Sequence, residues 1–484
     1  MMEDNWYPYE PVIGLEVHVR LGLDSKIFCD DPYLYGQQPN TLISPVSLAY
    51  PGTLPKVNKR AIEFAIKMGL ACDSEISTEA VFDRKNYFYP DLPKGYQLTQ
   101  DRNPICKGGR IGIKTKNGIK EIKLTKIHLE EDAGKSIHVH GAEFTQVDFN
   151  RAGTALIEMV TDPEIRTPEE AYSLMFEVRR LVRALGISDG NMEHGSMRCD
   201  ANVSIRKIGT DQLGTKVEIK NVNSFNNVKK ALILEIERQV SLVTKGEKII
   251  SESRTFDLST GKTHSMRTKE SLTDYRYFPD PDLTPVLIDK KWIKTLEQQL
   301  PELPMTQEIR YQKEYNLSSN DAAVLTDSQE LSEYFEKVVS ASGNPKASAN
   351  WVMGPVKSVL NDQNIQIDEF PISFEKLAMI IKWVDEKKIN QNFASKQLFS
   401  AALSYPDKPL SSLLDNTVGV SDDPDELQVI INDVIDKFPK EAEMFRKGKK
   451  KLIGMFMGQV MKETNGNADP KKVQKILLKA FDNK

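Results

Sequence analysis

Three segments in the N-terminal half of the chain alternate strictly between apolar and polar residues, and this pattern constrains the fold more than any other feature. The segments are residues 14–21 (GLEVHVRL), 196–206 (SMRCDANVSIR) and 216–221 (KVEIKN). A period of two places apolar side chains on one face of a strand and polar side chains on the other. The sequence therefore predicts half-buried strands in an antiparallel or mixed sheet with one polar face.

Helical signals accompany these strands. Thr167-Pro168-Glu169-Glu170 has the form of an N-cap, a proline at the first helical position and a capping-box glutamate, and an apolar stripe follows as far as residue 185. A second stripe begins near Ser224 and ends before Gly246. We expect both helices to pack their stripes into the core.

Beyond residue 293 the alternation fades and helical patterns dominate. Residues 347–360 predict a helix that Gly354-Pro355 should kink or break, and residues 373–385 predict an uninterrupted one. The predicted class is α+β. A mixed or antiparallel sheet domain (1–293) precedes an all-α domain (294–408) and a small helical tail (409–484).

The composition and the absence of several motifs exclude some classes of function. A net charge of −4 over 484 residues excludes a protein wholly devoted to coating nucleic acid. The four cysteines suit a reducing cytosol, the acidic first residues lack the pattern of a secretory signal, and no apolar run approaches the ~18 residues needed to cross a bilayer. The GK[ST] triplets at 134–136 and 261–263 lack the earlier glycine of a P-loop. Because no cysteine nucleophile is recognisable, catalysis would depend on acidic residues, histidine and lysine.

Carboxylates and histidines gather on the predicted polar face. They form four groups: Glu16/His18, His128-x-Glu130-Glu131-Asp132, Asp200/Asn202 and Glu218/Lys220/Asn221. Such side chains could converge on Mg²⁺, although a solvated sheet face with charge pairs is the simpler alternative. Strict alternation groups Glu130 with His128 and Asp132, whereas a bulge would bring Glu131 to that face, so both remain candidates.

Residues 82–100 interleave basic and aromatic side chains. Arg84 and Lys85 precede Tyr87, Phe88 and Tyr89, and residues 269–286 repeat this texture. The pattern suits phosphate contact and base stacking, although aromatic clusters also build cores.

Together these segments resemble the B subunits of bacterial tRNA-dependent amidotransferases. The similar stretches occur in the family's order along nearly the whole chain: IGLEVHV, FDRKNYFYPD, HLEEDAGKS, DFNRAGT, RCDANVSIR, EIKNVNSF, STGKT and DYRYFPDPDL. The resemblance implies a heterotrimer in which an amidase A subunit releases ammonia from glutamine and a small C subunit fastens A to B. The B subunit would use ATP to phosphorylate the side-chain carboxylate of Glu-tRNA(Gln), Asp-tRNA(Asn) or both, and ammonia would displace the phosphate. The lysine-rich end resembles a YqeY-type domain.

The resemblance also implies roles for individual residues. The implied catalytic and Mg²⁺-binding residues are Glu16, His18, Glu131 (with Glu130 as its rival), Asp200 and Glu218, and Arg84 and Lys85 become candidates for contact with phosphate or the acceptor end. Some members bind zinc through four cysteines, but here Cys29, Asp31, Ser44 and Ser47 stand at those places, so we expect no zinc.

The tail is basic in an otherwise acidic chain. Residues 440–484 hold twelve basic and five acidic side chains, and the run RKGKKK places Arg446, Lys447, Lys449, Lys450 and Lys451 together. We expect these five to contact tRNA phosphates. Two other classes of function stay open: a non-catalytic RNA-binding scaffold and a metal-dependent hydrolase.

Overall fold

The structure, a computed structural model, describes residues 6–138, 143–257, 260–268, 275–417, 424–464, 468 and 470–482. Its contacts divide the chain into two compact units, residues 1–306 and 307–484. The domain boundaries drawn from the sequence at 293 and 408 remain predictions. No helix among the described residues is long and apolar enough to cross a membrane.

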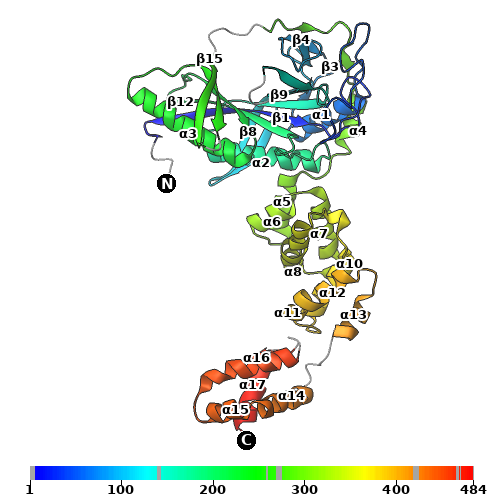
Figure 1. Cartoon of the computed structure of the whole chain (residues 1–484), viewed down its shortest axis with the longest axis vertical. Helices are drawn as coiled ribbons and strands as arrows, with labels where there is room; N and C mark the ends of the chain where they lie inside the picture. The colour runs from blue at the N-terminus through cyan, green and yellow to red at the C-terminus, as the bar shows by residue number, and fades with distance from the viewer. Residues whose placement is uncertain are drawn as a thin grey trace. The chain divides into compact units, whose positions relative to one another are not determined.

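The first unit contains a ten-stranded sheet in the order β15-β14-β13-β12-β1-β11-β8-β6-β2, with β7 paired to β8 (Figure 1). Among the described residues β13 and β14 pair in parallel and the other neighbours are antiparallel, which confirms the predicted mixed sheet. The strands are β1 (Tyr9–Arg20), β2 (Glu75–Ile76), β6 (Cys106–Lys107), β7 (Arg110–Thr115), β8 (Gly118–Glu131), β11 (Ala155–Thr161), β12 (Met197–Lys207), β13 (Val217–Val222), β14 (Glu252–Asp257) and β15 (Lys262–Thr268).

Three smaller sheets complete the first unit. They pair β9 (Lys135–His138) with β10 (Thr145–Asp148), β3 (Glu79–Ala80) with β17 (Val286–Leu287), and β4 (Asp83–Asn86) with both β5 (Tyr96–Thr99) and β16 (Phe278–Pro279). The last of these sheets joins the two basic and aromatic segments of the sequence, which lie nearly 200 residues apart.

One face of the large sheet is buried under α1 (Lys59–Ala71), α2 (Pro168–Ala184) and α3 (Phe225–Thr244), and α4 (Lys290–Glu297) packs on α1. Both helices expected in this half are confirmed. The Thr167 side chain caps α2 and that of Ser224 caps α3. Leu15, Val17 and Val19 of β1 are at most 1% exposed. The alternation therefore directs Glu16 and His18 to the opposite, polar face.

The second unit is helical in its described residues, with two separate hydrophobic cores. The first core belongs to α5 (Pro304–Glu314), α6 (Ser319–Leu325), α7 (Gln329–Ser342), α8 (Pro345–Trp351), η2 (Val352–Val356), α9 (Lys357–Gln363), η3 (Ile367–Glu369), α10 (Phe374–Asp385), α11 (Gln391–Phe393), η4 (Ala394–Leu398), α12 (Phe399–Ser404) and α13 (Leu410–Thr417). The second belongs to α14 (Pro424–Lys437), α15 (Pro439–Arg446), η5 (Lys450–Leu452), α16 (Ile453–Glu463) and α17 (Pro470–Asp482).

The interruption expected at Gly354-Pro355 is a turn of π-helix, η2, between α8 and α9. Proline has no backbone N–H and its ring crowds the preceding turn, so a regular α-helix cannot continue through Pro355. A wider turn accommodates the ring while the chain keeps its helical course. The helix predicted at 373–385 forms as α10, with Ser373 at its N-cap position.

Candidate active site

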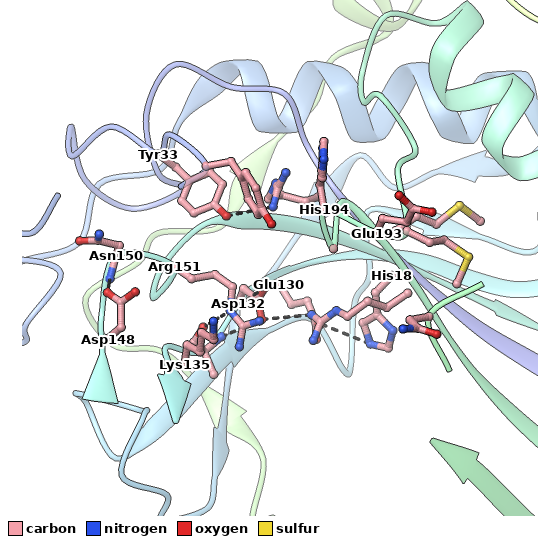
Figure 2. Close-up of a pocket in the computed structure, with 18 of the residues that line it drawn as sticks. His18, Tyr33, Glu130, Asp132, Lys135, Asp148, Asn150, Arg151, Glu193 and His194 are labelled. Atoms are coloured by element: carbon pink, nitrogen blue, oxygen red, sulfur yellow. Dashed lines mark hydrogen bonds and ion pairs between the residues drawn. The ribbon is translucent and has the colours of Figure 1, made fainter. Parts of the chain in front are cut away.

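The polar face of the large sheet opens on a cavity of about 890 Å³. Figure 2 shows His18 and Glu130 on strands of the sheet and Asp132 just beyond the end of β8, with Tyr33 and His194 above them in the view. The residues that line the cavity include Glu16, His18, Arg20, Tyr33, Lys85, Glu130, Asp132, Arg151, Glu158, His194, Arg198, Asp200 and Lys220. The cavity is therefore densely charged, with both signs of charge on its walls.

Strand register brings these charges together. Directly opposite residues on antiparallel strands have Cβ atoms only ~4.5–5.5 Å apart. One row across the sheet runs through His128, Glu158, His18 and Arg198, a second pairs Glu16 with Asp200, and a third pairs Asn202 with Glu218. The residues of the first two rows come from distant parts of the sequence.

The first acidic cluster consists of Glu16, Asp200 and Glu218. Each offers one carboxylate oxygen, and these oxygens all lie within 4.8 Å of one another. The Nζ atom of Lys220 lies 3.3 Å from Asp200 and 3.0 Å from Glu218. Asn202 donates to Glu16 over 2.8 Å, while its own buried side-chain oxygen accepts no hydrogen bond from the described residues. Several carboxylates beside an unsatisfied amide oxygen form a donor set that fits Mg²⁺.

The second cluster consists of His18, Glu130 and Glu158. His18 Nε2 lies 3.5 Å from Glu130 and 3.4 Å from Glu158, and His128 Nε2 lies 3.3 Å from Glu158. Burial opposes a charge on His18, but the two carboxylates outweigh it and raise its pKa to about 9. Burial also opposes a charge on Glu158, yet both histidines hold its pKa well below the usual range. Burial and the neighbouring Glu158 raise the pKa of Glu130. The two carboxylates thus favour the protonated form of His18.

Glu131 faces away from both clusters. Strand β8 keeps its alternation here, because Glu130 and Glu131 pair with successive residues of β11 without a shift. The Glu131 carboxylate accepts from Lys94 Nζ over 2.5 Å and from the backbone of Leu98 over 2.8 Å. Glu130, and not Glu131, lines the cavity, and the roles that the resemblance implies for these two residues remain predictions.

The two basic candidates on β4, Arg84 and Lys85, point to opposite faces of the strand. Lys85 lines the cavity, with its Nζ 4.9 Å from the ring centre of Tyr275. Arg84 points to the other face of the strand, where its guanidinium is paired with Asp280 over 2.5 Å and Asp282 over 3.1 Å. Successive side chains of a strand face opposite ways. Of the two, the geometry leaves only Lys85 facing the cavity.

Two arginines share one buried carboxylate at the cavity wall. Arg198 lies 3.0 Å and Arg151 lies 3.5 Å from Asp132, which is 6% exposed. Arg151 also donates to the backbone oxygens of Ala133 and Gly134. One carboxylate thus orients two guanidinium groups at the cavity wall.

The residues at the zinc-related positions form a hydrogen-bonded loop. The backbone N–H of Ser44 donates to Asp31 over 2.9 Å and to Ser47 Oγ over 3.0 Å. Burial opposes the charge of Asp31, but hydrogen bonds from Ser47, Ser44 and Cys29 hold its pKa below the usual value. Burial raises the pKa of Cys29 to about 11. The absence of zinc remains a prediction.

The five basic residues predicted in the tail lie around the junction of α15, η5 and α16. All five are exposed. Lys447 pairs with Glu443 within one helical turn, and the Arg446 guanidinium lies 6.0 Å from the ring centre of Phe481. Their tRNA contact remains a prediction.

Sequence reasoning gave no role to several charged groups of the cavity, among them Arg151, Glu158, Arg198 and Lys220. Glu158 is the one acidic residue in the apolar run ALIEMV, and a carboxylate within a buried strand is a usable signal. Arg198 stands on the polar face of an alternating segment, beside Asp200. Lys220 belonged to a recognised polar group but was given no role, because its pairing with Asp200 depends on strand register.

Two models of known protein families match separate parts of this chain. Residues 11–294 match the model of the GatB/GatE catalytic domain, and residues 333–481 match that of the GatB domain. A similar protein from Thermodesulfovibrio yellowstonii is the B subunit of an aspartyl/glutamyl-tRNA(Asn/Gln) amidotransferase, 46% identical over 97% of this chain and 99% of its own length. Proteins of the same name from Pelodictyon phaeoclathratiforme (45%, 98% and 99%) and Persephonella marina (44%, 97% and 98%) are similar over comparable lengths.

Proposed function

Because this chain belongs to the GatB family of aspartyl/glutamyl-tRNA(Asn/Gln) amidotransferase B subunits, we propose that it amidates misacylated tRNA with ATP. Its substrates are Glu-tRNA(Gln), Asp-tRNA(Asn) or both, in the cytoplasm. A partner amidase subunit supplies ammonia, and a small third subunit completes the heterotrimer. The observation that carries this proposal is the cavity that combines two acidic clusters with Lys85, Arg151 and Arg198.

The charges of the cavity suit the chemistry of carboxylate activation. The reaction brings the phosphates of ATP and the side-chain carboxylate of the aminoacyl group together, and phosphoryl transfer relies mainly on positioning and electrostatic stabilisation. Lys85 and the arginine pair on Asp132 supply cations that bind and orient these anions. The pair is already held by Asp132, so little rearrangement is needed when an anion binds.

Glu16, Asp200 and Glu218 would hold Mg²⁺, with Asn202 beside them. The ion, when bound, neutralises charge on phosphate oxygens. Glu130 and His18 belong to the neighbouring cluster, where the imidazole already bridges two carboxylates. His18, Glu130 and Glu158 also offer ligand atoms within 4.8 Å of one another, so His18 and Glu130 remain proposed Mg²⁺ ligands. We assign Glu131 to the packing of β8 against β5.

The proposal is tested with misacylated tRNA, ATP and free ammonium, an assay that bypasses the amidase subunit. Asp200→Ala and Glu218→Ala each remove a charged side chain from the polar face and leave the apolar face of the sheet intact. We expect amidation to fall about 100-fold or more, since a lost metal ligand costs several kcal/mol of charge stabilisation. Glutamine hydrolysis by the partner should persist at its basal level.

Glu121→Ala is the matched control, because Glu121 lies on the same sheet but is exposed, paired only loosely with Arg110 over 3.6 Å. It should amidate at the wild-type rate. Wild-type rates in both Asp200→Ala and Glu218→Ala would refute the catalytic assignment and favour the scaffold function.

A further inference from the structure

Lys220 lies where a cation bound by the first acidic cluster would lie. It stands on β13, two residues after Glu218, and its Nζ bridges Asp200 (3.3 Å) and Glu218 (3.0 Å). Its side chain is 38% exposed and lines the cavity. The ammonium group therefore has a path from the carboxylates into the space where substrate anions would bind.

An ordinary structural ion pair accounts for these contacts less well. Lys220 pairs with two of the three carboxylates that converge within 4.8 Å, whereas Glu16 accepts a hydrogen bond from the neutral amide of Asn202 and has no ion pair among the described residues. The buried oxygen of Asn202 has no partner among the described residues. A cluster built only to bind Lys220 would not need a third carboxylate or an unsatisfied oxygen.

We propose that Lys220 is an internal cation that occupies the Asp200–Glu218 position until a divalent cation and a phosphate arrive together. The inference rests on the proposed metal and ATP binding. When Asp200 and Glu218 bind the divalent cation, Lys220 must release them and needs another anion. Its flexible four-carbon stem lets the ammonium group turn into the cavity, where it can donate a hydrogen bond to a phosphate oxygen.

This exchange makes the two binding events depend on each other. Without phosphate, metal binding costs the ion pairs of Lys220 and leaves its ammonium group unpaired. With phosphate present, that cost is offset by the new contact. Coupling between two binding sites is reciprocal and commonly changes affinity about 5–150-fold. The first unit would then load metal together with phosphate rather than hold it permanently.

The test measures Mn²⁺ binding to the full-length chain by electron paramagnetic resonance, with protein-free blanks. In the absence of phosphate, Lys220→Met should bind Mn²⁺ about tenfold or more tightly than wild type. Lys220→Arg keeps the charge and should bind as weakly as wild type. Lys229→Met is the control for loss of one positive charge, since Lys229 pairs with Glu169 over 2.8 Å away from the cavity. It should also match wild type.

A second arm adds inorganic phosphate. It should tighten Mn²⁺ binding to wild type and have little effect on Lys220→Met. Equal Mn²⁺ affinity of Lys220→Met and wild type, or an equal gain in Lys229→Met, would overturn the exchange while leaving the metal site in place. If no variant binds Mn²⁺ even with ATP, the metal site of the proposed function fails as well. Melting curves of each variant establish that it is folded.

Discussion

Two neighbouring glutamates on β8 have opposite environments. Glu130 lines the cavity beside His18 and Glu158, and burial together with Glu158 raises its pKa. Glu131 is 3% exposed and is satisfied by Lys94 and by the backbone of Leu98. Burial therefore disfavours the charged form of Glu130, whereas both carboxylate oxygens of Glu131 have a hydrogen-bond donor.

Substitution should separate these two roles. Glu131→Gln breaks a largely buried ion pair, so we expect a loss of about 1–3 kcal/mol in the stability of the first unit. Glu130→Gln should leave stability within about 1 kcal/mol of wild type and reduce amidation with ammonium. Thermal unfolding and the ammonium assay, run on both variants, measure the two effects. The opposite pattern, with Glu131→Gln stable but inactive, would restore Glu131 to the active site.

At the scale of single elements, local sequence signals set where α2 begins. The side chain of Thr167 accepts from the backbone N–H of Glu170 over 3.1 Å, and Glu170 in turn accepts from the backbone N–H of Arg166 over 2.8 Å. Pro168 occupies the first helical position. Because α2 covers the apolar face of the sheet, its N-terminus supports the strands that display the charged cavity.

Thr167→Ala removes the N-cap and should cost about 1 kcal/mol. Thr167→Ser keeps a hydroxyl acceptor and should retain most of that stability. Differential scanning calorimetry of the full chain distinguishes the variants, because only the transition of the first unit should move to lower temperature. An unchanged transition in Thr167→Ala would mean that tertiary packing alone fixes the start of α2.

For the whole molecule, the distribution of charge separates two tasks. Carboxylates concentrate in the first unit's cavity, while the second unit ends in a basic segment of a chain whose net charge is −4. Exposed lysines on such a segment suit a polyanion, since phosphate binding releases counterions and needs no exact geometry.

Replacing Arg446, Lys447, Lys449, Lys450 and Lys451 together by Ala should weaken tRNA binding. The slope of log affinity against log salt should become shallower by roughly 0.7–0.9 for each phosphate group that the variant no longer binds. Lys437→Ala is the control, because Lys437 is exposed in the same unit but pairs with Glu463 over 2.8 Å. Assembly with the partner subunits should be unaffected. Unchanged affinity and slope in the fivefold variant would refute tRNA binding by this segment.

The sequence by itself determined which side chains share a face. Period-two alternation placed Glu16, His18 and Asp200 on the polar side of strands, and capping residues located α2 and α3. These are short-range properties: backbone geometry fixes the direction of a side chain relative to its neighbours along the chain. Alternation also grouped Glu130 with His128, and the structure keeps that grouping.

Only the tertiary structure decided which of those side chains meet. Strand β1 lies between β11 and β12, so Glu158 and Arg198 both lie opposite His18, although they lie 140 and 180 residues further along the chain. Lys220 reaches Asp200 only because β13 pairs with β12. Strand order and register depend on long-range packing of the apolar face, and a one-residue shift would exchange the faces. For that reason the composition of the polar face could be predicted from local pattern, whereas its ion pairs could not.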